Sequence, residues 1–511
     1  MMNSTPSASV VLSFVLAGSL GCLLQAKAPQ SIKIVSSADW KEHAQEIDGL
    51  SVEGGVLHPT GKKGVYRSRI IPFTQKSSVR SITLSCSPRW DNWVATPKKV
   101  APRALGDAPI FLVKGPKDYW LFGRYKGGNP KSKGFKPKKI NLKGYDMPLL
   151  STPDPDLFTA PGGLEKDRGG YHAFQSRDMK NWVHHGSVTD RHAKWSTTAE
   201  LVDGKAYIYY DFPNDQDPHL YIDEDLTDGK PGKDMGLAFL DPSDGSDCAI
   251  IRDLDGKFHL IYEDHSPINA RSHSWDSPLA GHAVSDNGIG GFKILPPAVD
   301  YRTKPTGVFK EYSHPHWHAE HPEKFPAKEG TKQAYARYEV HEPEQDAYGD
   351  WGAIAIGGRY YLVGDFHPAH QSIRTAILTS PSLDQKFEFI GELGNGHPDP
   401  DIGFAEGQFY LINQTPKDYV SPGPWVESVE VRVGVDTSKD GKADTWSEWA
   451  DVKELYDHTP GFSKQIKRIP ASMDLSKLPN GHGLSFDIRL TDTTENSSKP
   501  MIEQLEISFI P

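Results

Sequence analysis

The feature that most constrains the fold is a pattern written five times along the chain. A short apolar run with an acid near its start is followed by a glycine-containing turn and a second run rich in aromatic residues. The first copy reads "GDAPIFLVKGPKDYWLFGRY" from Gly106. The others read "TTAELVDGKAYIYYDF", "SDCAIIRDLDGKFHLIYED", "DWGAIAIGGRYYLVGDF" and "PDIGFAEGQFYLINQ". Each copy predicts a β-hairpin, and self-similar hairpins in series are typical of a propeller. We therefore expect an all-β fold with a five-bladed β-propeller over residues 105–420; five unrelated hairpins in a β-sandwich are the alternative.

The acids that head these hairpins are predicted to converge. They are Asp107, Glu200, Asp247, Asp350 and Asp401. The first strand of every propeller blade lines the central channel, so the strand starts meet at one end of the axis. The loops that leave the second strands return to the same end. An acidic, axial pocket with a polar rim is where we expect a functional site.

Polar and aromatic residues on that rim and at the strand starts are the candidates for substrate binding. They are Arg124, Glu200, His265, His316, Trp317, His318, His367, His397 and Asp401. For Glu200 and Asp401, a purely structural role is the alternative.

Composition excludes some classes of protein. Lys and Arg total 57 against 67 Asp and Glu, a formal charge of -10, whereas a general nucleic-acid binder should be basic. The 47 glycines, 40 prolines and abundant aromatic residues fit a loop-rich all-β protein.

The first residues predict export. The apolar run Val10 to Leu24 is too short for a transmembrane span and suits a signal peptide over residues 1–28, with cleavage after Ala28. Alternatively, Cys22 is lipidated and anchors a lipoprotein. We therefore expect a secreted or periplasmic protein.

The flanks of the hairpin region alternate apolar and polar residues, as half-buried strands do. Examples are "VRSITLSCSPRW" before it and "VESVEVRVGVD" after it. We expect residues 29–104 and 421–511 to form the two parts of one accessory β-sandwich with the chain ends close together. Two independent small domains are the alternative.

The five hairpins, the segment "WSTTAELVDGKAYIYY", the segment "SRDMKNWVHHG" and the acids heading the first and third copies resemble the five-bladed propeller glycoside hydrolases. That group includes the arabinanase and β-xylosidase family and the related α-neoagarobiose hydrolases. The resemblance covers roughly residues 105–420 and implies a glycoside hydrolase that acts on a polysaccharide or oligosaccharide.

The resemblance also implies roles for particular residues. The first-blade acid, Asp107, matches the general base, and the third-blade acid, Asp247, matches the residue that tunes the general acid. At the fourth blade, Asp350 stands where the arabinanase family has Glu. The neoagarobiose hydrolases use a His slightly upstream, so our candidates for the general acid are His341, then Asp350, then Glu342.

The chemistry of glycoside cleavage supports such an arrangement. A proton must reach the leaving oxygen while a nucleophile attacks the opposite face of the ring. If water is the nucleophile, the two groups stand about 6.5 to 9.5 Å apart, which facing sides of a funnel allow. We therefore expect an inverting hydrolase; a non-catalytic carbohydrate-binding propeller is the alternative.

No cofactor is required by this chemistry, but two segments raise the question of metal ions. The run "EYSHPHWHAEHPEKF" suggests zinc, although its prolines break a regular helix and a sugar-binding loop explains it as well. In "DTSKDGKADTW", Asp436, Asp440 and Asp444 surround Gly441, which suggests either a structural calcium loop or an ordinary polar turn.

Residues 126–143 carry seven lysines and no acid. This segment is either solvated or attracts an anionic glycan to the funnel. In the second case, activity on a charged glycan should fall as ionic strength rises. Replacing Lys136, Lys138 and Lys139 by Ser should remove much of that salt dependence, with a neutral glycan as the control. A triple variant that keeps the full salt response would show that the segment is only solvated.

Overall fold

The computed structural model describes most of the chain. The described residues are 28–86, 100–102, 105–125, 171–189, 195–211, 217–240, 247–264, 279–299, 346–368, 374–393, 399–413, 418–421, 428–491 and 501–511.

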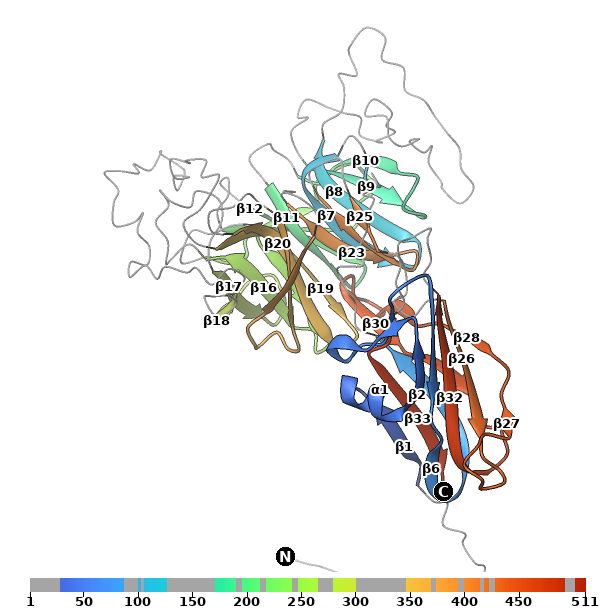
Figure 1. Cartoon of the computed structure of the whole chain (residues 1–511). Helices are drawn as coiled ribbons and strands as arrows, with labels where there is room; N and C mark the ends of the chain where they lie inside the picture. The colour runs from blue at the N-terminus through green and yellow to red at the C-terminus, as the bar shows by residue number, and fades with distance from the viewer. Residues whose placement is uncertain are drawn as a thin grey trace, which may run out of the picture.

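Five sheets, antiparallel except where β30 joins the fourth, follow one another along the middle of the chain (Figure 1). Sheet one holds β7 (Leu105–Gly115), β8 (Asp118–Tyr125), β9 (Tyr171–Ser176) and β10 (Val183–Ser187). Sheet two holds β11 (Trp195–Val202), β12 (Lys205–Asp211), β13 (Pro218–Asp223) and β14 (Lys233–Leu237). Sheet three holds β15 (Ala249–Arg252), β16 (Phe258–Glu263), β17 (Ala280–Ser285) and β18 (Lys293–Val299).

Sheet four holds β19 (Ala347–Ile356), β20 (Arg359–His367), β21 (Arg374–Ser380) and β22 (Glu388–Leu393). The hairpin β29 (Leu455–His458) and β30 (Gln465–Ile469) joins sheet four from the C-terminal flank. Sheet five is described over β23 (Asp401–Ala405), β24 (Gln408–Ile412) and β25 (Tyr419–Val420). Each predicted hairpin is thus the first two strands of one sheet.

The first strands of the sheets contact one another in a ring. β7 contacts β11, β11 contacts β15, β15 contacts β19, β19 contacts β23, and β23 returns to β7. Where the ring closes, a side chain at Gly403 would meet the ring of Phe111 at 2.2 Å, so β23 and β7 pack with no room for a Cβ. The arrangement is all-β and propeller-like, as the repeats predicted.

Strands from both flanks share one ten-stranded sheet, here called the flank sheet. Its main path is β1 (Gln30–Ile34), β33 (Gln504–Ile510), β6 (Ile71–Ser85), β32 (Gly481–Thr491), β26 (Val429–Val435) and β27 (Thr445–Trp446). β2 (Ala44–Asp48), β5 (Lys63–Ser68), β28 (Ala450–Val452) and β31 (Ala471–Asp474) pair off that path. Gln30 pairs with Phe509, so strands near both termini of the chain lie side by side (Figure 1).

The flank also contains β3 (Leu50–Ser51), β4 (His58–Pro59), one short 3-10 turn (Glu53–Gly55) and the helix α1 (Ser37–His43). Ser36 and Asp39 form a capping box that begins α1. Trp40 on this helix is fully buried.

One apolar core joins the flank sheet to the propeller-like part. It includes Val431 and Ile488 of the flank sheet together with Ile354, Val363 and Leu411 of sheets four and five. Burial of continuous apolar surface is the main favourable contribution to folding. The flank sheet and the two sheets beside it therefore stabilise one another.

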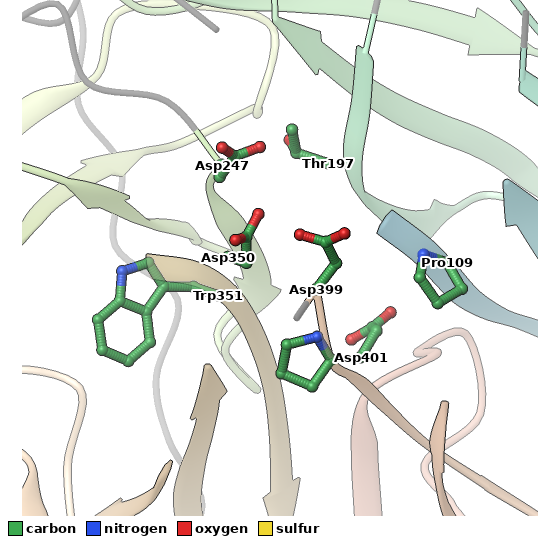
Figure 2. Close-up of a pocket in the computed structure, with 8 residues that line it drawn as sticks. Pro109, Thr197, Asp247, Asp350, Trp351, Asp399 and Asp401 are labelled. Carbon is green, nitrogen blue, oxygen red and sulfur yellow. The ribbon is translucent and has the colours of Figure 1, made fainter. Parts of the chain in front are cut away.

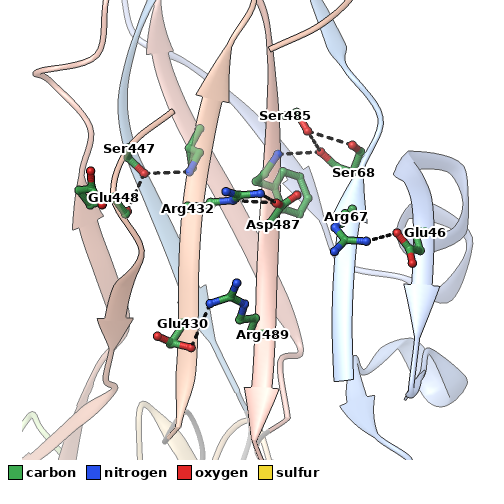
Figure 3. A network of polar contacts seen from close by, with 12 residues as sticks. Glu46, Arg67, Ser68, Glu430, Arg432, Ser447, Glu448, Ser485, Asp487 and Arg489 are labelled. Carbon is green, nitrogen blue, oxygen red and sulfur yellow. Dashed lines mark hydrogen bonds and ion pairs between the residues drawn. The ribbon is translucent and has the colours of Figure 1, made fainter. Parts of the chain in front are cut away.

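Arginine side chains of the flank sheet bind carboxylates on neighbouring strands (Figure 3) and also pack on two tryptophan rings. The Arg432 guanidinium lies 4.4 Å from the ring centre of Trp446 and donates to Asp487 from Nε at 2.8 Å. Arg489 lies 3.7 Å from the ring centre of Trp449. A guanidinium over an indole face combines packing with a cation–π interaction. These contacts tie β26, β32 and the segment around β27 together.

Two pairs of buried histidines lie inside the propeller-like part. His172 and His184 of sheet one are joined at 2.9 Å between Nδ1 and Nε2, and His259 and His282 of sheet three are joined in the same way at 2.9 Å. Burial lowers the pKa of His172 to about 4 and that of His282 to about 3. These rings are therefore neutral in the folded protein at neutral pH.

We expect acid to destabilise the fold through these pairs. The pKa of His172 is about 4 in the folded protein and 6.5 in the unfolded chain. The neutral ring therefore contributes its full stability above pH 6.5, and the free energy of unfolding falls as the pH drops from 6.5 toward 4. For His172 the loss should reach about 2 kcal/mol at pH 5. The free energy of unfolding, measured with urea at pH 7.5 and pH 5, should fall less in His172→Gln than in the wild type. His482→Gln, in the flank sheet, is the control; an equal pH effect in both variants would contradict the assignment.

Candidate active site

A pocket opens where the inner strands of the five sheets begin (Figure 2). Its lining residues are Pro109, Thr197, Asp247, Asp350, Trp351, Asp399, Pro400 and Asp401. Four of these eight side chains are aspartates, and they come from sheets three, four and five.

The three aspartates Asp247, Asp350 and Asp399 share an unusual backbone conformation. Their φ angles are 46°, 50° and 58°, in the left-handed region that Asp tolerates better than most residues. Asp350 forms a bulge in β19, and Asp247 and Asp399 lie two residues before β15 and β23, the inner strands of their sheets. We call these three residues the head aspartates.

Each head aspartate is held by a carboxylate from the preceding sheet. The Asp247 N–H donates to Asp211 of β12 at 3.1 Å, and the Asp350 N–H donates to Glu263 of β16 at 3.1 Å. The Asp399 N–H completes the series by donating to Asp365 of β20 at 3.0 Å. The same bond therefore joins sheets two to three, three to four and four to five.

The head aspartates and their carboxylate partners crowd together. Oxygens of Asp247, Glu263 and Asp350 lie within 4.8 Å of one another, and so do oxygens of Asp350, Asp365 and Asp399. Groups of this size could hold a metal ion, although acidic clusters are common without one. Asp350 belongs to both groups and is the centre of the cluster.

The environment of Asp350 favours a protonated carboxyl group. Part of this residue is exposed, but protein atoms surround its carboxyl. Burial raises the pKa of Asp350 well above its usual 3.8, and the charges of Asp399 and Asp247 raise it further. A carboxyl that keeps its proton beside ionised neighbours can serve as a general acid.

Trp351 forms one wall of the pocket beside Asp350. Its indole is 2 % exposed and stacks on Tyr348, with ring centres 5.8 Å apart. A side chain at Gly364 would meet the Trp351 ring at 2.9 Å, so this glycine makes room for the indole. The wall is therefore fixed by packing within sheet four.

Glu200 lies deeper in the channel, away from the pocket lining. It is fully buried and accepts hydrogen bonds from the backbone N–H groups of Leu201 at 2.8 Å and Ser463 at 3.1 Å. Our expectation that Glu200 heads an inner strand was wrong, because it is the sixth residue of β11. Thr197 occupies the corresponding place in the pocket lining.

Asp401 is both a pocket residue and a structural one. Its carboxylate accepts from Phe111 N at 2.7 Å and from Ile402 N at 2.8 Å, which joins sheet five to sheet one. The residue that makes the head contact in sheet five is Asp399, two positions earlier. Asp401 is the first residue of β23 and lines the pocket, as the sequence predicted, but the sequence did not indicate the second contact made by Asp399.

Four further acids of the cluster were missed from the sequence: Asp211, Glu263, Asp365 and Asp399. A signal for three of them was present, because the second runs of the middle copies end in "YYDF", "IYED" and "VGDF". An acid at the end of a strand reads as an ordinary turn residue until the strand order places it beside the next sheet.

The structure places the other predicted site residues as follows. Asp107 lies on β7 and Arg124 on β8, although the structure does not describe their side chains. His367 is half-buried at the end of β20. The candidates outside the described residues are His265, His316, Trp317, His318, His341, Glu342 and His397.

In the suggested calcium loop, the aspartate side chains accept hydrogen bonds from backbone N–H groups of the same loop. Asp436 accepts from the N–H groups of Lys439 at 2.6 Å and Gly441 at 2.9 Å, and Asp444 accepts from Thr437 N at 2.7 Å. Asp440 accepts a hydrogen bond from the backbone N–H of Lys442 at 2.9 Å. These bonds are those of a polar turn, and calcium binding stays a prediction.

Within the described residues, the structure holds no helix long and apolar enough to cross a membrane.

Comparison with known proteins returns matches among solved structures. No family model matches the chain, and no curated protein matches it. An endo-arabinase from Bacteroides thetaiotaomicron is matched with a TM-score of 0.38 and 8 % identity over 64 % of this chain and 96 % of that one. A thermostable family-43 glycoside hydrolase is matched at 0.35 and 10 %, over 74 % and 96 %. A family-43 arabinoxylan arabinofuranohydrolase from Bacillus subtilis is matched at 0.34 and 12 %, over 80 % and 95 %. These are the kinds of protein that the sequence resembles, but at such TM-scores the likeness carries no argument about activity.

The acid cluster yields a prediction about stability. A carboxyl whose pKa is raised by folding adds stability at low pH and loses it as the pH rises through the folded value. Asp350→Asn keeps the shape and removes the ionisation, so its melting temperature should exceed that of the wild type by a few degrees at pH 8 and not at pH 4. Calorimetry at both pH values tests this, with the exposed turn residue Asp255→Asn as control. If Asp350→Asn is no more stable than the wild type at pH 8, the raised pKa of Asp350 is contradicted.

Proposed function

We propose that this protein is an exported glycoside hydrolase that cleaves a polysaccharide or oligosaccharide with inversion of configuration. The observation that carries the proposal is Asp350: a carboxyl with a raised pKa, at a pocket, among carboxylates from three sheets. Glycosidic cleavage needs such a protonated acid, whereas a passive sugar-binding pocket gains nothing from it.

In this proposal Asp350 donates the proton to the leaving oxygen. Asp247 keeps the pKa of Asp350 high, because its charge adds to that of Asp399. Asp350 was our second candidate, after His341, which lies outside the described residues. The raised pKa supports Asp350.

Asp247 itself is too near to be the base. Its carboxylate lies within 4.8 Å of that of Asp350, and an inverting pair needs about 6.5 to 9.5 Å to admit water. Asp107 is the third residue of β7, the inner strand of sheet one, and sheet one follows sheet five in the ring. Asp107 therefore remains our candidate for the base that activates water.

The proposal includes the finer architecture that the sequence predicted. We propose that the five sheets are five blades around one axis and that the flank sheet is an accessory sandwich. The ring of contacts among the five inner strands supports the first, and the pairing of β1 with β33 and of β6 with β32 supports the second.

The charge of the pocket bears on the substrate. Carboxylates line it, so the sugar bound there should offer hydroxyl donors and carry no negative charge. If the natural glycan is anionic, as the lysine segment suggests, its charged groups should lie outside this pocket. A plant or algal polysaccharide with neutral cleavable residues fits both.

The test is a panel of plant and algal polysaccharides assayed for new reducing ends. Asp107→Asn should lower turnover by about 10²-fold or more and leave sugar binding largely intact, because the base is lost while its shape is kept. The exposed turn residue Asp203→Asn is the matched control.

Two outcomes would decide against parts of the proposal. Binding of a glycan without any release of reducing ends would favour a non-catalytic carbohydrate-binding propeller. A product formed with retained configuration, read by NMR of the fresh anomer, would contradict the inverting mechanism and the role of Asp107.

A further inference from the structure

The C-terminal flank places a lysine inside the propeller channel. Among the described lysines and arginines, Lys464 is the only one in the buried class, with 2 % of its surface exposed. It lies at the end of the turn between β29 and β30, the hairpin that joins sheet four. β30 runs parallel to β19, with Gln465 beside Ala355, and so enters the channel from the end opposite the pocket.

The ammonium group of Lys464 clamps two inner strands together. Its Nζ donates to Thr198 Oγ1 on β11 at 2.9 Å and to the carbonyl of Ile250 on β15 at 2.9 Å. The Ile250 N–H donates to the same Thr198 hydroxyl at 3.1 Å. Sheets two and three are thereby fixed to each other through one charged group.

This clamp lies directly below the pocket. Thr198 follows the pocket residue Thr197, and Ile250 is three residues after Asp247. A rotation or slip of either strand would move Thr197 or the carboxylate of Asp247. The position of Lys464 therefore affects the pocket although its side chain does not line it.

The residue before Lys464 extends the clamp to other sheets. The Ser463 N–H donates to Glu200 at 3.1 Å, and its hydroxyl accepts from Val113 N on β7 at 2.8 Å. The hairpin tip thus contacts sheets one, two and three, while β30 pairs with sheet four.

The surroundings of Lys464 explain why a charged group is kept there. Its charge lowers the pKa of Glu200 and of Asp401, which burial raises, and Arg252 acts on Glu200 in the same sense. The charge of Lys464 also lowers the pKa of the buried Cys248 thiol, which burial raises. A buried ammonium is costly unless carboxylates and acceptors surround it, and here both are present.

We infer that Lys464 is a positioning residue of the candidate active site, supplied by the C-terminal flank to hold the inner strands of sheets two and three beneath Thr197 and Asp247. The role in turnover rests on the proposed glycoside hydrolase activity. The clamp itself does not depend on that activity, so the two can be tested separately.

The test compares Lys464→Met with Lys467→Met in the full chain. Met has a similar length without the charge, and Lys467 is an exposed residue of the same strand. In Lys464→Met, kcat on the substrate found in the glycan panel should fall by about tenfold or more while Lys467→Met is unchanged. Infrared absorption of protonated carboxyl groups gives a second readout that needs no turnover. Its titration should move to higher pH by about one unit or more in Lys464→Met.

The double variant Lys464→Met/Glu200→Gln separates positioning from charge balance. It removes a buried cation and a buried anion together, so it should regain stability while kcat stays low, because the clamp on Thr198 and Ile250 is still absent. Full recovery of kcat would overturn the positioning role, and so would an unchanged titration in Lys464→Met. If neither Lys464→Met nor the double variant folds, Lys464 is needed for folding, and the positioning role is likewise overturned. If the wild type cleaves no glycan, the proposed function is contradicted but the clamp is not. The infrared titration needs no turnover and still tests the clamp.

Discussion

The hydrogen bond between a head aspartate and an acid near the end of the second strand of the preceding sheet is the contact on which the site depends. It occurs at Asp247, Asp350 and Asp399, each time with the backbone in the left-handed region. This bond joins neighbouring sheets at the pocket and also brings their carboxylates close together. The contacts that join sheets two to five are therefore the same contacts that concentrate charge at the pocket.

Such a concentration of acids opposes folding, because like charges repel in a poorly solvated channel. The protein offsets this cost in two ways. The backbone N–H groups of Ser463, Phe111 and Ile402 donate to the deeper carboxylates, and the ammonium of Lys464 supplies the opposite charge. The strongest influences on the pKa of Asp350 are its burial and the charges of neighbouring carboxylates, all of which raise it, and that is the physical reason to expect its proton to be retained.

The flank sheet takes part in this site at a distance. It shares an apolar core with sheets four and five, and it sends the hairpin β29–β30 into the channel. The described contacts thus make the flank an internal support for the pocket, because removing it would expose that core and withdraw the only buried lysine described. This is a stronger coupling than two domains joined by a linker would have.

The sequence by itself determined the elements and their order, because hairpin periodicity, glycine turns and alternating apolar residues are local properties. It also indicated Asp247 and Asp350, because an acid that precedes an apolar run can be recognised from the amino-acid sequence. Only the tertiary structure decided which acids meet. Asp211, Glu263 and Asp365 end second strands, and nothing local distinguishes them from turn residues until each is placed beside the next sheet. Asp399 and Asp401 are two positions apart, and only the packing of the sheets gives them different contacts. Asp399 donates its N–H to Asp365 of sheet four, whereas the carboxylate of Asp401 joins β23 to β7. Lys464 is the extreme case: it lies more than 200 residues from both Thr198 and Ile250, and a buried charge of this kind exists only because strands distant in sequence surround it with acceptors.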